Sequence, residues 1–312
     1  MDQGFVFSVF LVAWLSSAIR LSGPLLLAAL GETFAERSGV LNIGIEGTML
    51  LGAVTSYLVT LWTGSPWVGL LSAVALGVLA NIFLAWMYVH VQANQVVVGI
   101  IFNTLALGLA SYVYRLGMTG ATGPQKVAML DPVAIPLLSA IPVLGPVLFN
   151  HSVLLYLTVL LVAVASLALY RTRFGLQLRA AGENPRAASA AGIDIVRMRY
   201  IGVLLSGGAA GAAGAYLILV QVGLFRETIV AGQGFIALAV VIFGRWDPWK
   251  AALAAFVFGA ADALQLSLQL FQVGLPPQLL LSLPYVLTII AMSGILGKTH
   301  QPEALMTSWR RE

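Results

Sequence analysis

The 312-residue sequence contains no cysteine, only three histidines and few charged residues, which make up 9% of the chain. Without cysteine, the chain forms no disulfide and offers no thiol for catalysis or metal binding. His90, His151 and His300 lie far apart, and no group of histidines and carboxylates has the spacing of a metal site. A G-x-S-x-G nucleophile motif is also absent. These absences argue against an enzyme and against a bound metal or cofactor.

The sequence also lacks a nucleotide-binding loop. In the stretch SGILGKTH (293–300), two residues separate Gly294 from Gly297, whereas a phosphate-binding P-loop has four residues between its glycines. The stretch also follows an apolar helix rather than a strand. Any ATP hydrolysis is therefore expected in a partner subunit.

Hydrophobic residues make up 60% of the chain, so there is too little polar surface to surround a soluble core. Several apolar stretches exceed the roughly 18 residues typical of a transmembrane helix. We therefore expect a single all-α polytopic membrane domain over residues 1–312, with about 8–10 transmembrane helices, some of them broken or re-entrant. The predicted spans are 5–31, 40–62, 66–90, 95–114, 151–170, 200–222, 233–244, 249–270 and 278–297.

Two of these spans are unusual. The first contains Arg20, Gly23 and Pro24, so 5–31 is either one kinked helix or two shorter pieces. Segment 233–244 is too short to cross a hydrocarbon core of about 30 Å at about 1.5 Å per residue. Helices broken at membrane depth often line substrate pathways, which makes 233–244 a candidate for such a position.

Lys and Arg predict the orientation of the chain, because they concentrate in cytoplasmic loops of membrane proteins. They gather in 32–39, 171–199, 244–250 and the tail 298–312, which we therefore place in the cytoplasm. This gives a multi-pass protein of the cell (inner) membrane with a cytoplasmic C-terminus. The net charge of +4 reflects this loop pattern rather than a nucleic-acid-binding face, so no nucleic-acid partner is expected.

The longest predicted outer loop, 115–150, is rich in proline and glycine. Such composition predicts an ordered, non-helical cap or a segment with one short helix, rather than another crossing. This extracytoplasmic loop is either a simple connector or a contact for a soluble partner.

The largest cytoplasmic loop, 171–199, contains a polar stretch with clear helix-end signals, GENPRAASAAGID (182–194). Asn184 is a good N-cap, Pro185 suits the first helical position, and Gly192 suits a left-handed C-terminal residue. The stretch is either an ordinary loop helix or a docking helix that transmits the motion of a cytoplasmic partner. The predicted coupling residues are Glu183, Asn184, Pro185, Arg186, Ala187, Ala188, Gly192 and Ile193.

Polar residues within the spans are candidates for a substrate path, because burying them is costly and they usually face a bundle interior or cavity. If 40–47 is helical, Asn42 and Glu46 share one face, where they bind a polar solute, bind each other or clamp two helices. Asp262 and Gln265 also share a face, either toward a solute or as a polar seam. The candidate path residues are Asn42, Glu46, Asn94, Gln95, Asn103, Gln233, Phe235, Asp262 and Gln265.

Two further patterns predict packing and membrane position. The small-residue run SGGAAGAAGA (206–215) predicts close helix–helix contact. Trp246 and Trp249 flank a turn at a predicted membrane edge, where tryptophan is typical of interfacial anchors.

Four stretches together resemble a known permease family. RAASAAG (186–192) approximates the EAA…G coupling pattern of ABC importer permeases, with Arg186 in place of the acidic residue. The stretches LGETFAERSGVLNIGIEGTMLLGA (30–53), ANQVVVGIIFNTLALGL (93–109) and GFIALAVVIFGRWDPWKAALAAFVFG (234–259) are similar to the branched-chain amino acid/ribose-type permease superfamily. Within that superfamily they look most like the nucleoside (basic membrane protein-associated) branch.

This resemblance implies a permease subunit of an ATP-driven importer for nucleosides or related solutes, with sugars and branched-chain amino acids as other substrates of the same architecture. It also implies a second, non-identical permease, a cytoplasmic ABC ATPase and an extracytoplasmic substrate-binding lipoprotein as partners, with membrane lipid around the spans of this chain. The alternative is an ion-coupled secondary transporter. That alternative needs a buried carboxylate, for which Asp262 and Glu46 are available, and internal repeats, of which the sequence has no clear example.

Overall fold

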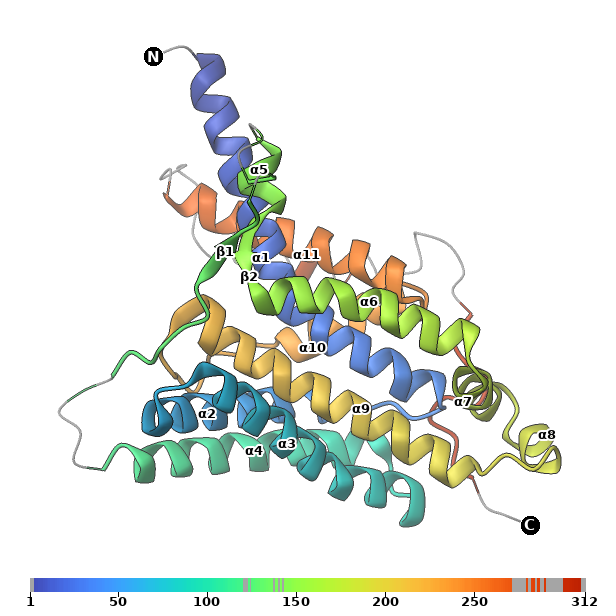
Figure 1. Cartoon of the computed structure of the whole chain (residues 1–312). Coiled ribbons are helices and arrows are strands. Elements are labelled where there is room, and N and C mark those ends of the chain that lie inside the picture. Colours follow the sequence, from blue (N-terminus) through green and yellow to red (C-terminus); the bar gives the residue numbers. More distant parts are fainter. Residues whose placement is uncertain are drawn as a thin grey trace.

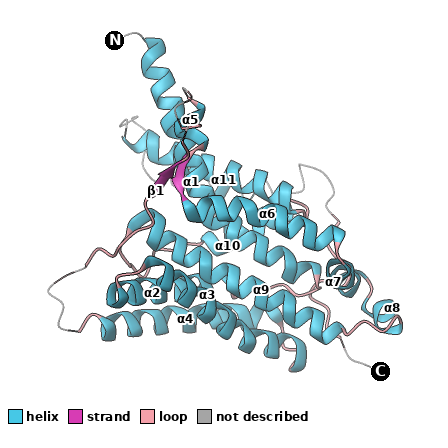
Figure 2. Ribbon diagram, viewed as in Figure 1, coloured by secondary structure: helices cyan, strands magenta, loops and turns pink. Residues whose placement is uncertain are grey.

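The computed structural model describes the chain except for residues 1–2, 120–122, 124, 137, 140, 142, 271–278, 280–281, 284, 287–288, 290–299 and 310–312. Within the described residues the fold is a helical bundle, with one pair of short strands at one end (Figures 1 and 2). Seven of the described helices are long and apolar enough to cross a membrane. The predicted class, an all-α polytopic membrane protein, is confirmed.

The long helices correspond closely to the predicted spans. Their bounds are α1 (Gln3–Arg37), α2 (Ile45–Thr63), α3 (Pro66–Ala85) with the π-helix η1 (Trp86–His90), α4 (Gln95–Gly117), α6 (Val153–Arg171), α9 (Ile195–Tyr216) with the π-helix η2 (Leu217–Val222), and α11 (Pro248–Leu270). The shorter elements are α5 (Leu144–Leu148), α7 (Arg173–Glu183), α8 (Pro185–Ala190), α10 (Gln233–Phe243) and the strands β1 (Pro132–Ala134) and β2 (Asn150–Ser152).

The first segment is one candidate span rather than two pieces, because α1 is a single continuous helix that contains Pro24. Segment 233–244 is short, as predicted, and forms the 11-residue helix α10. At about 1.5 Å per residue, α10 extends only about halfway across a hydrocarbon core of about 30 Å. Most of the predicted span 278–297 lies outside the described residues.

Helix α9 is the centre of the bundle and packs against α1, α2 and α3 (Figure 1). Its small-residue run makes this possible, as the sequence predicted. A Cβ atom on Gly211 would overlap the carbonyl oxygen of Ala73 in α3 and come within 3.3 Å of the Gly77 Cα. The helices therefore approach at backbone distance, where van der Waals contact rather than hydrophobic burial holds membrane helices together.

The loops gather at two opposite ends of the bundle. One end, called here the coupling end, brings together the turn 38–44, helices α7 and α8, the turn 244–247 and residues 300–309. The opposite end contains β1 and β2, which pair antiparallel, and the short helix α5 (Figure 2). The described part of the predicted outer loop 115–150 thus contains one short helix and a strand.

The packing at α9 generates a stability prediction. Gly211→Ala should lower the free energy of unfolding by about 1–3 kcal/mol, because the added methyl group has no space against α3. The matched control is Gly108→Ala in α4, where a new Cβ meets nothing within 4 Å. Thermal unfolding of the detergent-solubilised protein measures both changes. Equal melting temperatures for the two variants would contradict the close contact.

Candidate substrate path and coupling surface

The first turn of α2 meets the beginning of α10 inside the bundle. The Glu46 carboxyl group accepts hydrogen bonds from the backbone N–H of Gly232 (2.8 Å) and of Gly234 (2.7 Å). Gly234 lies so close that a Cβ atom there would be 2.7 Å from the Glu46 Cα. An acidic side chain suits the positive end of a helix dipole and satisfies N–H groups that a helix start leaves unpaired. Glu46 therefore acts as a capping group for α10, supplied by another helix.

Asn103 of α4 makes a similar contact with the beginning of α2. Its Oδ1 accepts a hydrogen bond from the Gly47 N–H (2.8 Å), and its Nδ2 donates one to the Ile43 carbonyl oxygen (2.9 Å). The side chain thus satisfies backbone groups on both sides of the turn that precedes α2. Three helices meet at this point, and polar side chains fix their relative positions.

Two predicted path residues extend this contact region. Gln233 lies between the two glycines that bond Glu46, and its Oε1 is buried without a hydrogen-bond partner among the described residues. Phe235 follows directly and is 46% exposed. We call Glu46, Asn103, Gln233 and Phe235 the α2–α10 junction. It offers one unused amide oxygen and one accessible aromatic ring.

Asn42 lies apart from the junction in a buried polar network. Its Nδ2 donates to Asn81 Oδ1 (2.7 Å) and Ser206 Oγ (3.0 Å), while its backbone N–H donates to Glu32 (2.8 Å). Ser206 Oγ in turn donates to Glu32 (2.7 Å), so the network joins α1, α3 and α9. The prediction that Asn42 and Glu46 share a helical face is wrong, because α2 begins only at Ile45. The contacts of Asn42 are those of a helix clamp.

The other predicted path residues do not join the junction. Asn94 caps α4 by accepting hydrogen bonds from Val96 and Val97, and Gln95 Oε1 accepts one from the Leu41 N–H (2.8 Å). Asp262 and Gln265 lie on α11, which packs along α1. Neither side chain makes a hydrogen bond within the described ranges, and Gln265 is only 8% exposed. The proposed contact of these two residues with a solute stays a prediction.

The coupling end contains two short helices where one was predicted. For α8 the predicted ends are confirmed: the Asn184 side chain accepts from the Ala187 N–H (3.0 Å), and Gly192 has a φ of +83°. Helix α7 was missed. Its signals are present in the sequence, because the Thr172 hydroxyl caps the Gly175 N–H (3.1 Å) and apolar residues recur on one face.

The two faces of α8 have different surroundings. Ala187 is exposed, whereas Ala188 is 5% exposed and packs in a small apolar cluster with Leu178 and Ile195. Ile193 is half-buried against the same cluster. Within 183–193, the segment that contains α8, the exposed residues are Glu183, Asn184, Arg186, Ala187, Ala190, Ala191 and Gly192. Ala188 and Ile193 thus hold α8 in place because their side chains pack into the protein, and their role in coupling stays a prediction.

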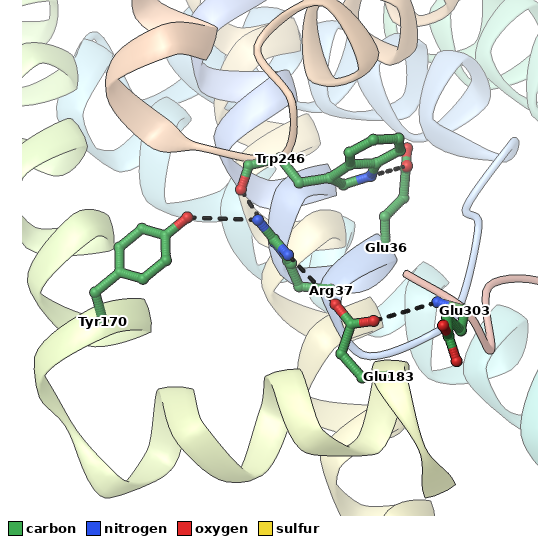
Figure 3. Close-up of polar contacts among 6 residues, drawn as sticks. All are labelled: Glu36, Arg37, Tyr170, Glu183, Trp246 and Glu303. Carbon is green, nitrogen blue, oxygen red and sulfur yellow. Dashed lines mark hydrogen bonds and ion pairs between the residues drawn. The ribbon is translucent and has the colours of Figure 1, made fainter. Parts of the chain in front are cut away.

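Arg37, at the end of α1, links this helix to α6, to α7 and to the turn 244–247 (Figure 3). Its guanidinium group pairs with Glu183 (3.7 Å), donates to the Trp246 carbonyl oxygen (3.1 Å) and lies 3.5 Å from the Tyr170 hydroxyl. The Trp246 indole donates to the buried Glu36 carboxyl group. Trp246 is 2% exposed, so the prediction that it anchors the membrane interface is wrong. Trp249, at 56%, is exposed.

Residues 300–309, called here the C-terminal strap, cross the coupling end. The backbone N–H of Ala304 donates a hydrogen bond to the Gly182 carbonyl oxygen (2.9 Å), and that of Met306 donates one to the Gly39 carbonyl oxygen (3.1 Å). The Thr307 carbonyl oxygen accepts a hydrogen bond from the Arg199 side chain (2.8 Å), and the Trp309 carbonyl oxygen accepts one from the Gln92 side chain (2.8 Å). The strap thus ties α7 to α9 and to the loops before α2 and α4. The sequence contained no signal for it, because most of these contacts use backbone groups.

At the opposite end, a polar cavity of about 360 Å³ lies between α1, η2 and the strand pair. Arg20, Asp131 and His151 line it, and the first two are exposed. His151 lies 2.7 Å from the Val147 carbonyl oxygen. Burial lowers the pKa of the His151 imidazole, and the positive charge of Arg20 acts in the same direction. The cavity therefore presents an arginine and an aspartate beside a partly desolvated imidazole.

Comparison with known proteins gives consistent matches over most of the chain. Residues 14–292 match the family described as branched-chain amino acid transport system / permease component. The guanosine ABC transporter permease protein NupQ of Bacillus subtilis is 39% identical over 91% of this chain and 92% of its own length. The nucleoside ABC transporter permease protein NupC of Lactococcus lactis is 36% identical over the same shares. A second guanosine permease of B. subtilis, NupP, is 29% identical over 75% of this chain and 68% of its own length.

No solved structure of another protein matches this chain.

The geometry of the junction predicts the effect of removing the Glu46 carboxyl group. Glu46→Ala leaves two partly buried N–H groups without their acceptor, at a cost of about 1 kcal/mol. We expect faster hydrogen–deuterium exchange over 229–240, with Glu46→Gln intermediate because one acceptor remains. Glu227→Ala is the control, since Glu227 makes only an exposed pair with Arg115 (3.8 Å). Unchanged exchange in Glu46→Ala would show that the cap is dispensable.

Proposed function

Because this chain belongs to the permease-component family of branched-chain amino acid transport systems, we propose that it carries nucleosides or related solutes across the cell membrane as a subunit of an ATP-driven importer. The observation that carries the choice of substrate is the 39% identity, over nearly the full length of both chains, to a guanosine permease. As in that family generally, the permease subunit is not itself an enzyme, and ATP is hydrolysed by a separate subunit.

The α2–α10 junction is our candidate for the solute contact. Stacking of a nucleobase on an aromatic ring contributes about 1–3 kcal/mol, and the Phe235 ring is accessible for it. The unused Gln233 oxygen accepts a hydrogen bond from a base N–H or sugar hydroxyl. No like-charge cluster lies at the described part of the junction, which suits an uncharged solute. Glu46 and Asn103 position the two helix starts and are already engaged.

The exposed face of α8 is our candidate for the contact with the ATPase. Its alanine surface lets another protein approach closely, and its inner face is fixed by Ala188 and Ile193. The Arg37–Glu183 pair and the C-terminal strap link this module to α1, α9 and the turn before α2. Motion of α8 would therefore reach several spans at once. This assignment places the coupling end and the C-terminus in the cytoplasm, in agreement with the Lys and Arg distribution.

The remaining partners follow from the same assignment. A second, non-identical permease would complete the path, as supported by the likeness of this chain to two guanosine permeases of one bacterium. A substrate-binding lipoprotein would dock at the opposite end, where the strand pair and the polar cavity with Arg20 and Asp131 lie. The alternative of an ion-coupled secondary transporter has less support, because the Glu46 carboxyl group is occupied as a helix cap.

Uptake measurements test the substrate and the energy source. In cells lacking this chain, uptake of radiolabelled guanosine should fall and should return when the chain is supplied. Unlabelled nucleosides should compete, whereas glucose and leucine in the same excess should not. Depleting ATP with the ion gradient clamped should stop uptake. If collapsing the gradient stops uptake while ATP remains, the secondary-transporter alternative holds; competition by glucose or leucine alone would overturn the choice of substrate.

The coupling role of α8 is tested by adding bulk to its exposed face. Ala187→Trp should reduce co-purification of the ATPase by about tenfold or more, a loss of about 1.4 kcal/mol or more in binding. The control is Ala134→Trp, because Ala134 is also exposed but lies on β1 at the opposite end. Both variants should reach the membrane in normal amounts. ATPase recovery at the wild-type level with Ala187→Trp would refute the docking role.

A further inference from the structure

A second large hollow lies on the side of the bundle, away from the residues proposed for the path. It measures about 530 Å³, within the range of about 300–1,000 Å³ typical of small-molecule sites. Its floor is α1, and its walls come from α3, α6 and α9. Every lining residue is apolar, including Leu30, Phe34, Val164, Ala168 and Ala209. No member of the α2–α10 junction lines it.

The hollow opens away from the protein core. Leu161, Val164 and Leu205 line it and are 45%, 49% and 42% exposed. Small residues make the depression: Ala165 and Ala168 on α6, and Gly208 on α9. All four surrounding helices are candidate membrane spans, so the opening faces the hydrocarbon region. We call this hollow the α6–α9 groove; both helices lie on the near face in Figure 1, with α1 behind them.

Arginines stand at the coupling end of this groove. Arg173 directly precedes Phe174, which lines the groove, and Arg171 ends α6 about one turn beyond Ala168. Arg197 lies about two turns before Leu204, on the same face of α9. All three are exposed, and none makes an ion pair within the described part of the chain. An apolar groove at membrane depth that ends in cations matches a phospholipid with an anionic headgroup.

We propose that the α6–α9 groove binds one acyl chain of an anionic phospholipid, with its phosphate held by Arg171, Arg173 and Arg197. The acyl chain fills space that the small residues leave empty, and the arginines select a negative headgroup over a zwitterionic one. The assignment of this lipid to the cytoplasmic leaflet rests on the orientation proposed above. The binding of the lipid in the groove does not depend on that orientation. Because α6 leads into α7 and α9 follows α8, the lipid sits between the two spans that carry the coupling helices.

Native mass spectrometry of the delipidated full-length protein tests this site with added phosphatidylglycerol or phosphatidylcholine. Wild type should retain phosphatidylglycerol at least about tenfold better, a difference of about 1.4 kcal/mol. Replacing Arg171, Arg173 and Arg197 with Gln should remove this preference. The charge-matched control changes Lys126, Arg226 and Lys250 to Gln, since all three are exposed and none lines the groove. Equal retention of the two lipids by wild type overturns the proposal.

The second test fills the groove with a larger side chain. Ala168→Phe should abolish tight lipid retention, whereas Leu167→Phe should not, because Leu167 is 59% exposed and does not line the groove. Wild-type retention by Ala168→Phe would place the lipid elsewhere and refute the assignment. The cysteine-free chain also allows a specific label: Val164→Cys, alkylated with a benzophenone maleimide and irradiated, should crosslink to phospholipid in the assembled complex. If it crosslinks to the second permease instead, the groove is a protein interface. Uptake is not measured in these tests, so their failure leaves the transport function standing.

Discussion

The constraint on which the structure depends is the absence of water around backbone groups at membrane depth. Helix α10 begins against the first turn of α2, where its first N–H groups are partly shielded from solvent, and a group left unsatisfied in an apolar environment costs several kcal/mol. Glu46 supplies the acceptor from α2, and Asn103 does the same for the turn before α2. A helix can start at this depth only because a neighbouring helix completes its hydrogen bonds. The irregular backbone and the polar side chains near it therefore depend on each other, because the side chains complete the hydrogen bonds that the irregular backbone leaves open.

At the coupling end, a different set of contacts attaches the loops and short helices to the membrane-spanning helices. There the connections are an ion pair from Arg37, the buried indole of Trp246 and the backbone contacts of the strap. Each joins segments far apart in sequence, so α7 and α8 are attached to the spans by direct contacts as well as by their linkers. The apolar cluster beneath α8 adds packing to these polar contacts. Together these contacts hold α7 and α8 in place against the spans.

Local patterns in the sequence predicted the helices, while partners remote in sequence decided the roles of single residues. Hydropathy located the spans, and the signals at Asn184 and Gly192 located α8, because these features depend on neighbours within a few residues. The small residues around Gly211 predicted close packing for the same reason. The burial of Trp246 and of Ala188 was not predicted, since it depends on Glu36 and on α7, respectively. The strap could not be predicted at all, because backbone hydrogen bonds carry no side-chain signature.

Helix α10 has a consequence that follows from where its two ends lie. Its first residues form the contact with Glu46, and the turn after its last residue contains Trp246, which touches Glu36 and Arg37. The helix has 11 residues and spans about 16 Å, so it works as a short rigid rod between these two points. No loop separates its ends. A shift of the Trp246 turn at one surface of the membrane would thus displace Gln233 and Phe235 in the interior by a comparable amount.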